Sequence, residues 1–196
     1  MSIQKILVTG ANGQLGWELA QAASSFPNFE FVFVDRNAMD LSNISEFKSV
    51  IDLFAPDAII NTAAYTAVDK AETEKELAYT VNAKSVELMS SYAASKNIPF
   101  ISFSTDYVFD GSKAGFYTED DVRNPLGAYG KSKAAGEEAI EKAFLNASQG
   151  QFAIFRTSWV YGAGGNFIRT ILRLAKEREA LNIIQDQQGV PTSAQW

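Results

Sequence analysis

An apolar segment that leads straight into a glycine-rich turn, close to the N-terminus, restricts the fold more than any other feature of this chain. Ile3 to Thr9 has the pattern of a strand buried on both faces, and the turn after it carries Gly10, Gly13 and Gly16. Glycines suit such a turn because they let backbone N–H groups approach a pyrophosphate at the N-terminus of the following helix. The turn therefore predicts a dinucleotide site, although a plain strand–helix connection also uses glycine.

The alternation of strand-like and helix-like segments continues along the whole chain, which indicates an α/β fold. We expect one Rossmann-type doubly wound parallel sheet, formed by a single NAD(P)-binding domain over residues 1–196. In such a sheet the ligand lies beyond the carboxyl ends of the strands. Further strands are expected at Phe29–Val34, Asp57–Thr62, Pro99–Ser104, Phe152–Thr157 and Leu181–Gln185, and helices at Gly16–Ser24, Ser45–Phe54, Glu74–Ser95, Tyr129–Leu145 and Asn166–Glu179.

The composition excludes several classes of function. The 196 residues include neither cysteine nor histidine, which rules out thiol nucleophiles, histidine-ligated zinc and Ser-His-Asp hydrolysis. The net charge of -6 argues against a nucleic-acid partner, because such proteins present a basic face. No apolar run reaches the roughly 18 residues of a membrane span, and no signal-peptide pattern occurs. We therefore expect a cytoplasmic protein with no membrane partner and no metal.

Charged residues after the second strand bear on the choice of cofactor. Asp35 ends that strand about twenty residues after the glycine turn, where an acidic side chain binds the ribose hydroxyls of NAD. Arg36 follows, and a guanidinium there suits the 2′-phosphate of NADP, so the cofactor is predicted to be NADPH or NADH. Asp40 and Leu41 are placed to contact adenine. The alternatives are a solvated turn carboxylate for Asp35 and a helix cap at Asp40.

A tyrosine and a lysine at helical spacing are the best candidates for proton transfer in a chain without histidine. Tyr129 and Lys133 lie at i and i+4, on one face of a helix that begins just after the ligand edge. A nearby ammonium is expected to lower the pKa of the phenol from its ordinary value of about 10. Tyr92 and Lys96 have the same spacing but precede a strand at the opposite edge of the sheet, so we interpret them as structural.

Two further features lie on or near this ligand edge. Thr105 and Asp106 follow the strand that ends at Ser104, and a long loop separates them from Tyr129. Small residues after Asn61 leave room for a flat cofactor above the sheet, although alanine is also a good packing residue. Gly136 lies inside the predicted catalytic helix, where it is either required by a close neighbour or lies on the surface.

Several motifs together resemble one protein family over nearly the whole chain. They are the glycine turn, NTAAYTAVDKAE at 61–72, STDYVFDG at 104–111, YGKSKAAGE at 129–137, RTSWVYG at 156–162 and DQQGVPT at 186–192. The chain resembles the extended short-chain dehydrogenases/reductases, and among them the branch that reduces dTDP-4-dehydrorhamnose. The resemblance implies NADPH- or NADH-dependent reduction of the 4-keto group of dTDP-4-dehydro-L-rhamnose to dTDP-L-rhamnose, for cell-wall polysaccharide.

The resemblance also implies a role for each matching residue. Tyr129 would protonate the developing alkoxide, Lys133 would hold the nicotinamide ribose and tune Tyr129, and Thr105 would bond the sugar oxygen. The remaining roles are Gly13, Gln14 and Leu15 on the pyrophosphate, Asp35, Asp40 and Leu41 on the adenosine, Ala64, Tyr65 and Thr66 along the cofactor, and Asp106 and Trp159 on the dTDP-sugar substrate. For Trp159, a place in the core is the alternative.

Members of this family continue into a smaller C-terminal substrate lobe, whereas these 196 residues stop where that lobe is expected to begin. We therefore expect this chain to bind dinucleotide but to turn over substrate poorly. The family also implies a possible homodimer. Glu18 is a possible carboxylate for a magnesium site, but Gln195 lies where a second acid is expected, so no metal is assigned. Alternative functions are another nucleotide-sugar reductase or epimerase, and a non-catalytic NADP-binding regulatory subunit.

Overall fold

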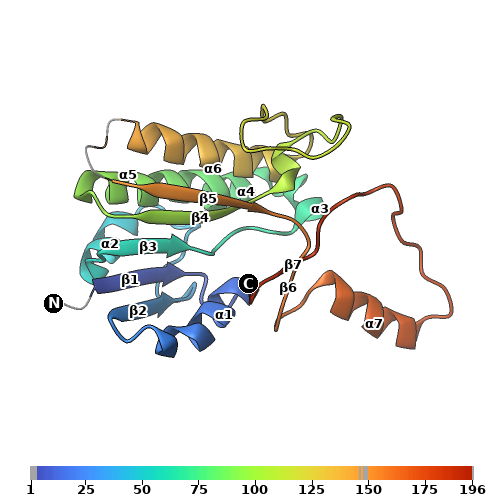
Figure 1. Ribbon diagram of the computed structural model, residues 1–196, viewed down its shortest axis with the longest axis horizontal. Helices are drawn as coiled ribbons and strands as arrows, with labels where there is room; N and C mark the ends of the chain where they lie inside the picture. Colours follow the sequence, from blue (N-terminus) through green and yellow to red (C-terminus); the bar gives the residue numbers. More distant parts are fainter. Residues whose placement is uncertain (1–3, 146, 148–149, 196) are drawn as a thin grey trace.

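A five-stranded parallel sheet forms the centre of the fold (Figure 1). The computed structural model describes residues 4–145, 147 and 150–195. All neighbouring strands of this sheet pair in parallel, in the order β2-β1-β3-β4-β5, which confirms the predicted Rossmann-type architecture. The strands are β1 Gln4–Thr9, β2 Phe29–Val34, β3 Ala58–Asn61, β4 Phe100–Thr105 and β5 Phe152–Thr157.

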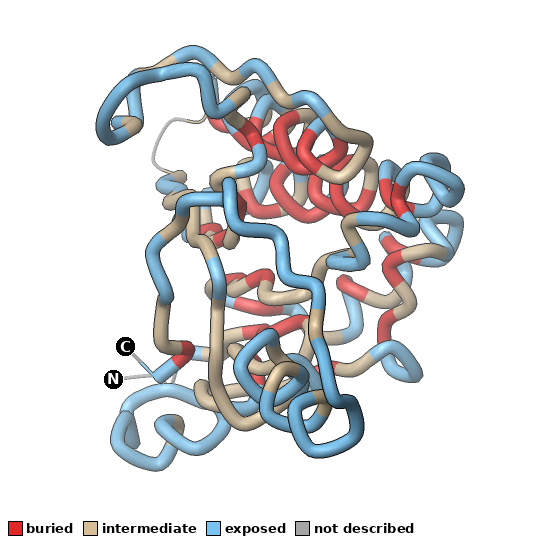
Figure 2. The backbone as a smooth tube through the Cα atoms, turned by 90° about the vertical axis from the view of Figure 1, so that its right-hand side faces the viewer, coloured by how far each residue is buried: buried red, intermediate tan, exposed pale blue. Residues whose placement is uncertain are grey.

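Helices cover one face of the sheet completely and the other only in part. α2 (Phe47–Phe54), α5 (Ser85–Lys96) and α6 (Ala128–Phe144) share one apolar core with the sheet, and this is the most buried part of the chain in Figure 2. α1 (Gln14–Ala22) contacts β2. Among the described residues, no helix is long and apolar enough to cross a membrane. The short helices are η1 Ala23–Ser25, α3 Val68–Ala71, α4 Lys75–Tyr79 and η3 Asp106–Val108.

The helix predicted at 74–95 is interrupted by one π-helical turn, η2 (Thr80–Lys84), between α4 and α5. Such turns are rare and occur often beside functional sites. Gly136 of α6 packs against this turn, because a Cβ at that position would lie 2.2 Å from the carbonyl oxygen of Asn82. The glycine is therefore required by the close approach of α6 to η2, and it does not lie on the surface.

The prediction of a strand at Leu181–Gln185 was wrong. That segment is irregular and mostly exposed, and it connects α7 (Phe167–Glu177) to β7 (Thr192–Ser193). An apolar run becomes a strand only where a neighbouring edge satisfies its backbone, and here the pairing is between β6 (Val160–Tyr161) and β7. α7 stands away from the sheet with no buried residue (Figure 1), which leaves Phe155 of β5 51% exposed.

Candidate active site

Three strands bring the candidate residues to one edge of the sheet, as the sequence predicted. A buried polar row crosses their carboxyl ends: Thr9 Oγ1 donates to Asn61 Oδ1 at 2.7 Å, and Asn61 Nδ2 donates to Ser102 Oγ at 3.4 Å. Beyond this row, Thr62 Oγ1 donates to the carbonyl of Thr9 at 2.6 Å. The row fixes the end of β3 against the end of β1, so that the loop after β3 lies beside the glycine turn.

The glycines of the turn have different roles. Gly10 has φ +77° and a Cβ there would lie 2.7 Å from the backbone nitrogen of Ala63, so it allows β3 to approach. A Cβ on Gly16 would lie 2.3 Å from the carbonyl oxygen of Gly10, so it closes the turn. Gly13 is exposed at the N-cap of α1, and a Cβ there would meet only one carbonyl oxygen, at 3.2 Å. Gly13 therefore leaves an open approach to the N–H groups of the first helical turn.

The two residues after Gly13 belong to different environments. Leu15 is half-buried in α1. The Gln14 side chain donates to the carbonyl of Val160 at 3.4 Å and accepts from Asn166 Nδ2 at 3.4 Å. The Gln14 amide thus joins the glycine turn to the segment that follows β5, which the sequence pattern did not indicate.

Asp35 lies beside the glycine turn, as expected, and is half-buried. Its carboxylate accepts hydrogen bonds from the backbone of Asn37 (2.9 Å) and Ala38 (3.2 Å) and from Asn12 Nδ2 (3.3 Å). The bond from Ala38 is the largest of these effects, and together they hold the pKa of Asp35 below its usual value.

The adenosine contacts predicted after Asp35 are not supported by the side-chain positions. Leu41 is 7% exposed and belongs to the core under α2, so it does not present its side chain to an adenine ring. The Asp40 carboxylate accepts from the backbone and hydroxyl of Ser42 at 2.9 and 2.7 Å, and from Arg36 Nε at 3.2 Å. The helix-cap alternative is not supported either, because α2 begins at Phe47 with Glu46 as its N-cap, and the bonds of Asp40 organise a turn before that helix. Arg36 is largely exposed, with its guanidinium at the surface.

The segment after β3 is held from behind by a residue that the sequence analysis missed. Asn82 is buried in η2; its side chain accepts from the backbone nitrogen of Tyr65 (2.8 Å) and donates to the carbonyl of Tyr65 (3.0 Å) and to Ser132 Oγ (2.9 Å). The Tyr65 phenol donates to Glu74 at 2.7 Å, which raises the pKa of Tyr65 to about 12. Ala64 is half-buried and Thr66 exposed. An asparagine in a helix interior was the available signal, since its helix propensity is poor.

Thr105 and Tyr129 meet at the end of β4. Tyr129 lies in the first turn of α6, and the Thr105 side chain beside it acts to lower the pKa of its phenol. Thr105 Oγ1 also donates to Asp106 Oδ1 at 3.0 Å, and the ring of Tyr107 packs edge-on against Tyr129 with centroids 5.7 Å apart. Burial is the largest effect on Asp106 and raises its pKa.

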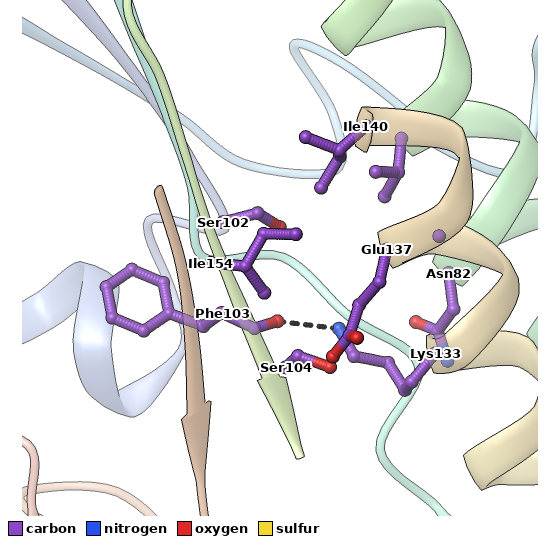
Figure 3. A pocket seen from close by; sticks show the side chains of 10 residues that line it. Asn82, Ser102, Phe103, Ser104, Lys133, Glu137, Ile140 and Ile154 are labelled. Atoms are coloured by element: carbon purple, nitrogen blue, oxygen red, sulfur yellow. Dashed lines mark hydrogen bonds between the residues drawn. The ribbon is translucent and has the colours of Figure 1, made fainter. Parts of the chain in front are cut away.

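Lys133 does not tune the phenol in the way the spacing predicted. Its ammonium is buried and donates to the carbonyl of Phe103 at 2.7 Å, as Figure 3 shows. Burial lowers the pKa of Lys133 to about 8, against a smaller opposing effect of Glu137. Burial raises the pKa of Tyr129, and the hydrogen bond with Thr105 opposes this increase. The expected lowering of the phenol pKa is therefore wrong for this arrangement, because the ammonium faces a backbone carbonyl.

The remaining predicted residues are placed as follows. Trp159 has φ +46°, is 46% exposed and packs over Gly189, so it is not a core residue. Lys96 lies over the ring of Tyr92 at 5.9 Å, and Tyr92 packs against the core, in agreement with the structural interpretation of that pair. Within the described part of the chain, no group of Cys, Asp or Glu side chains has the geometry of a metal site.

Sequence comparison places this arrangement in a known family. A family model described as "RmlD substrate binding domain" matches residues 4–196. The dTDP-4-dehydrorhamnose reductase of Aggregatibacter actinomycetemcomitans is 45% identical over 189 residues, which are 96% of this chain and 63% of that protein. The reductase of Salmonella typhimurium is 44% identical and is also covered to 63%, with 97% of this chain matched. The chain thus spans less than two thirds of these relatives.

Solved structures agree with the sequence comparison. The structure of a dTDP-4-dehydrorhamnose reductase from Clostridium acetobutylicum matches with a TM-score of 0.88 and 39% identity, covering 97% of this chain and 66% of that one. The reductase of Bacillus anthracis, solved in complex with NADP, matches with a TM-score of 0.88 and 36% identity, covering 98% and 67%. The chain has a Rossmann-type sheet with the glycine turn, Thr105 and Tyr129 at its ligand edge. The family model covers nearly all of it, so this chain belongs to the RmlD substrate-binding-domain family.

Proposed function

We propose that residues 1–196 form the NAD(P)-binding Rossmann domain of a reductase that converts dTDP-4-dehydro-L-rhamnose to dTDP-L-rhamnose. The observation that carries this proposal is the placement of Thr105 beside the Tyr129 phenol at the carboxyl end of β4, on the same sheet edge as the glycine turn. A non-catalytic NADP-binding subunit has no need of a half-buried phenol beside a hydroxyl group. The relatives named dTDP-4-dehydrorhamnose reductase support the choice of sugar.

The residues at the glycine turn fit a dinucleotide. Gly13 leaves the N-terminus of α1 open for a pyrophosphate, and the half-buried Asp35 carboxylate is hydrogen-bonded to Asn12 of the same turn. The exposed guanidinium of Arg36 suits a 2′-phosphate, so we propose NADPH with NADH as the second donor. The NADP complex of the Bacillus anthracis reductase supports the choice of NADPH as the first donor.

The proposed reaction needs a proton donor beside the substrate carbonyl. A bound reduced nicotinamide supplies hydride to C4 of the sugar. Tyr129 donates its phenolic proton to the 4-keto oxygen as that oxygen becomes an alkoxide, and its raised pKa keeps it protonated for this step. Thr105 orients the phenol. Lys133, fixed on the carbonyl of Phe103, anchors this face of α6 to β4.

Oxidation of NADPH with dTDP-4-dehydro-L-rhamnose, measured with the protein at its natural C-terminus, tests the proposal. Tyr129→Phe should lower kcat by a factor of about 100 to 10,000 without weakening NADPH binding, which fluorescence titration measures separately. Tyr92→Phe is the matched control, because that tyrosine also has a lysine four residues on but packs against the core. Full activity of Tyr129→Phe would refute the role of the phenol.

Wild-type protein that folds and binds NADPH but does not oxidise it with this sugar would refute the substrate assignment. The 196-residue chain by itself is expected to bind NADPH and to turn over slowly, and full-rate turnover would contradict that expectation. A homodimer and a cytoplasmic location also stay predictions, which analytical ultracentrifugation and cell fractionation test.

A further inference from the structure

The face of α6 that carries Tyr129 and Lys133 continues with two glutamates at the same spacing. Glu137 and Glu141 follow at i+4 steps, so all four side chains lie along one side of the helix. Glu137 is 2% exposed, and a buried carboxylate needs partners because its charge has left water. The proposed mechanism gives Glu137 no role. Figure 3 shows it close to Lys133 in the buried space behind the catalytic face.

Two arginines from different parts of the chain meet on Glu137. Arg156 of β5 donates through Nε at 3.0 Å and through Nη2 at 2.7 Å. Arg123, near the end of the loop 106–127 that connects β4 to α6, donates through Nη1 at 3.0 Å and also binds Glu141 in a bidentate manner at 2.8 and 2.7 Å. Burial disfavours the charge on Glu137, but the bonds from both arginines keep its pKa below the usual value.

The loop 106–127 is thereby attached to α6 at a second point. Its first point is beside the active site, where the carbonyl oxygen of Tyr107 would lie 2.2 Å from a Cβ on Gly130 and the Tyr107 ring packs on Tyr129. At the second point, Arg156 also lies 5.0 Å from the ring centroid of Phe109 and donates to the carbonyl of Glu119 at 3.2 Å. The ionic cluster thus involves the loop at Phe109, Glu119 and Arg123.

Contacts within the loop 106–127 connect its two points of attachment to α6. The rings of Phe109 and Tyr117 stack with centroids 4.2 Å apart, and Asn124 donates its backbone N–H to the carbonyl of Val108 at 2.9 Å. The Asp110 carboxylate accepts from Asn124 Nδ2 and from the Tyr117 hydroxyl, at 2.9 and 3.0 Å. These bonds join the start of the loop to Asn124, the neighbour of Arg123, so we expect a shift of the arginine to move the end that carries Asp106 and Tyr107.

We propose that Glu137, with Arg123 and Arg156, is a positioning residue: it holds the loop 106–127 on α6 and so sets where Thr105, Asp106 and Tyr107 lie against the proton donor. A buried ion pair is weak support for a role in stability, because apolar residues of equal volume often stabilise as much. A defined position for the loop is what a cluster of directional, bidentate bonds provides and an apolar contact does not. This inference rests on the proposed reductase function for its kinetic consequence.

Two substitutions test the proposal in the natural protein. Glu137→Gln keeps the shape and removes the charge, and Arg123→Lys keeps the charge but loses the planar fork. Both should lower kcat about 10- to 100-fold with an unchanged KM for NADPH, because a small misplacement at the reacting groups has that effect. Glu138→Gln is the control, since that glutamate is the exposed neighbour on the same helix.

A second readout does not require turnover. The ultraviolet difference between each protein and its Tyr129→Phe version follows ionisation of the Tyr129 phenol alone. In Glu137→Gln and Arg123→Lys, a loosened loop should admit water and move that titration down, toward the ordinary value for tyrosine. An unshifted titration with kcat equal to that of Glu138→Gln would overturn the proposal, even if the melting temperature falls. If Glu137→Gln does not fold, the kcat and the Tyr129 titration of Arg123→Lys alone test the proposal. If the wild type does not reduce the sugar, the proposed reductase function is refuted. The Tyr129 titration still tests whether Glu137 positions the loop, because it does not require turnover.

Discussion

Lys133→Met isolates the free energy of burying the lysine ammonium beneath the candidate active site. Burial lowers the pKa of Lys133 from 10.5 to about 8, while the unfolded chain keeps the ordinary value. Each unit of this difference corresponds to 1.36 kcal/mol, so the charged form destabilises the folded state by about 3 kcal/mol. Methionine has similar length and no charge. The substitution also removes the hydrogen bond that the ammonium donates to the carbonyl of Phe103.

The sign of the pH dependence follows from which state releases its proton first. Below about pH 8 the lysine is charged in both states and the folded protein carries the full destabilisation. Between about pH 8 and 10.5 the folded state releases its proton before the unfolded state does, so the free energy of unfolding rises. The wild type should therefore gain about 3 kcal/mol relative to Lys133→Met across this window.

Urea unfolding at a series of pH values from 7 to 10.5, followed by circular dichroism, measures this difference. Lys131→Met is the control, because Lys131 is exposed on the neighbouring turn of α6 and its charge stays in water when the chain folds. Lys131→Met retains Lys133, so its free energy of unfolding should rise across this window as that of the wild type does. If the free energy of unfolding of the wild type runs parallel to that of Lys133→Met over the whole pH range, burial does not lower the pKa of Lys133 and the reasoning is refuted.

Three further substitutions test other parts of the structure. Gly136→Ala should lower the free energy of unfolding by about 1–3 kcal/mol, because its Cβ would meet the Asn82 carbonyl, whereas Gly165→Ala, with no atom within 4 Å, should not; chemical denaturation compares them. Asn82→Leu should raise the KM for NADPH and lower stability by about 1–3 kcal/mol, since the backbone groups of Tyr65 lose their partner; unchanged kinetics would contradict this. Arg36→Ala should weaken NADPH binding about tenfold and leave NADH binding unchanged, as measured by calorimetry; equal losses would exclude a 2′-phosphate contact.

The sequence predicted backbone features well where they depend on local patterns. The strands at 29–34 and 152–157 have the predicted bounds, because continuous apolar runs flanked by turn residues are unambiguous. The glycine turn, the edge position of Thr105 and the separation of Tyr129 from Tyr92 follow from strand–helix order alone. The segment 181–185 has an equally apolar pattern but no paired edge, so its prediction was wrong.

Side-chain partners depend on elements far apart in the chain, and they were predicted poorly. The i+4 spacing puts Lys133 on the same face as Tyr129 but does not determine that its ammonium turns to the carbonyl of Phe103 on β4. The sequence predicted that Leu41 contacts adenine, but the structure places its side chain in the core under α2. The arginines around Glu137 come from a loop and from β5, and no periodicity connects them.

The contacts of Gln14 have a consequence for the order in which the site forms during synthesis. This side chain bonds to groups 146 and 152 residues away, after β5. Domains fold as the N-terminal part emerges first, and contacts with large sequence separation form late. The glycine turn and β1 therefore exist on the ribosome long before their last neighbours are made. A nascent chain arrested before Val160 should contain the glycine turn without the groups that Gln14 contacts, so this edge of the sheet is among the last parts of the molecule to reach its final shape.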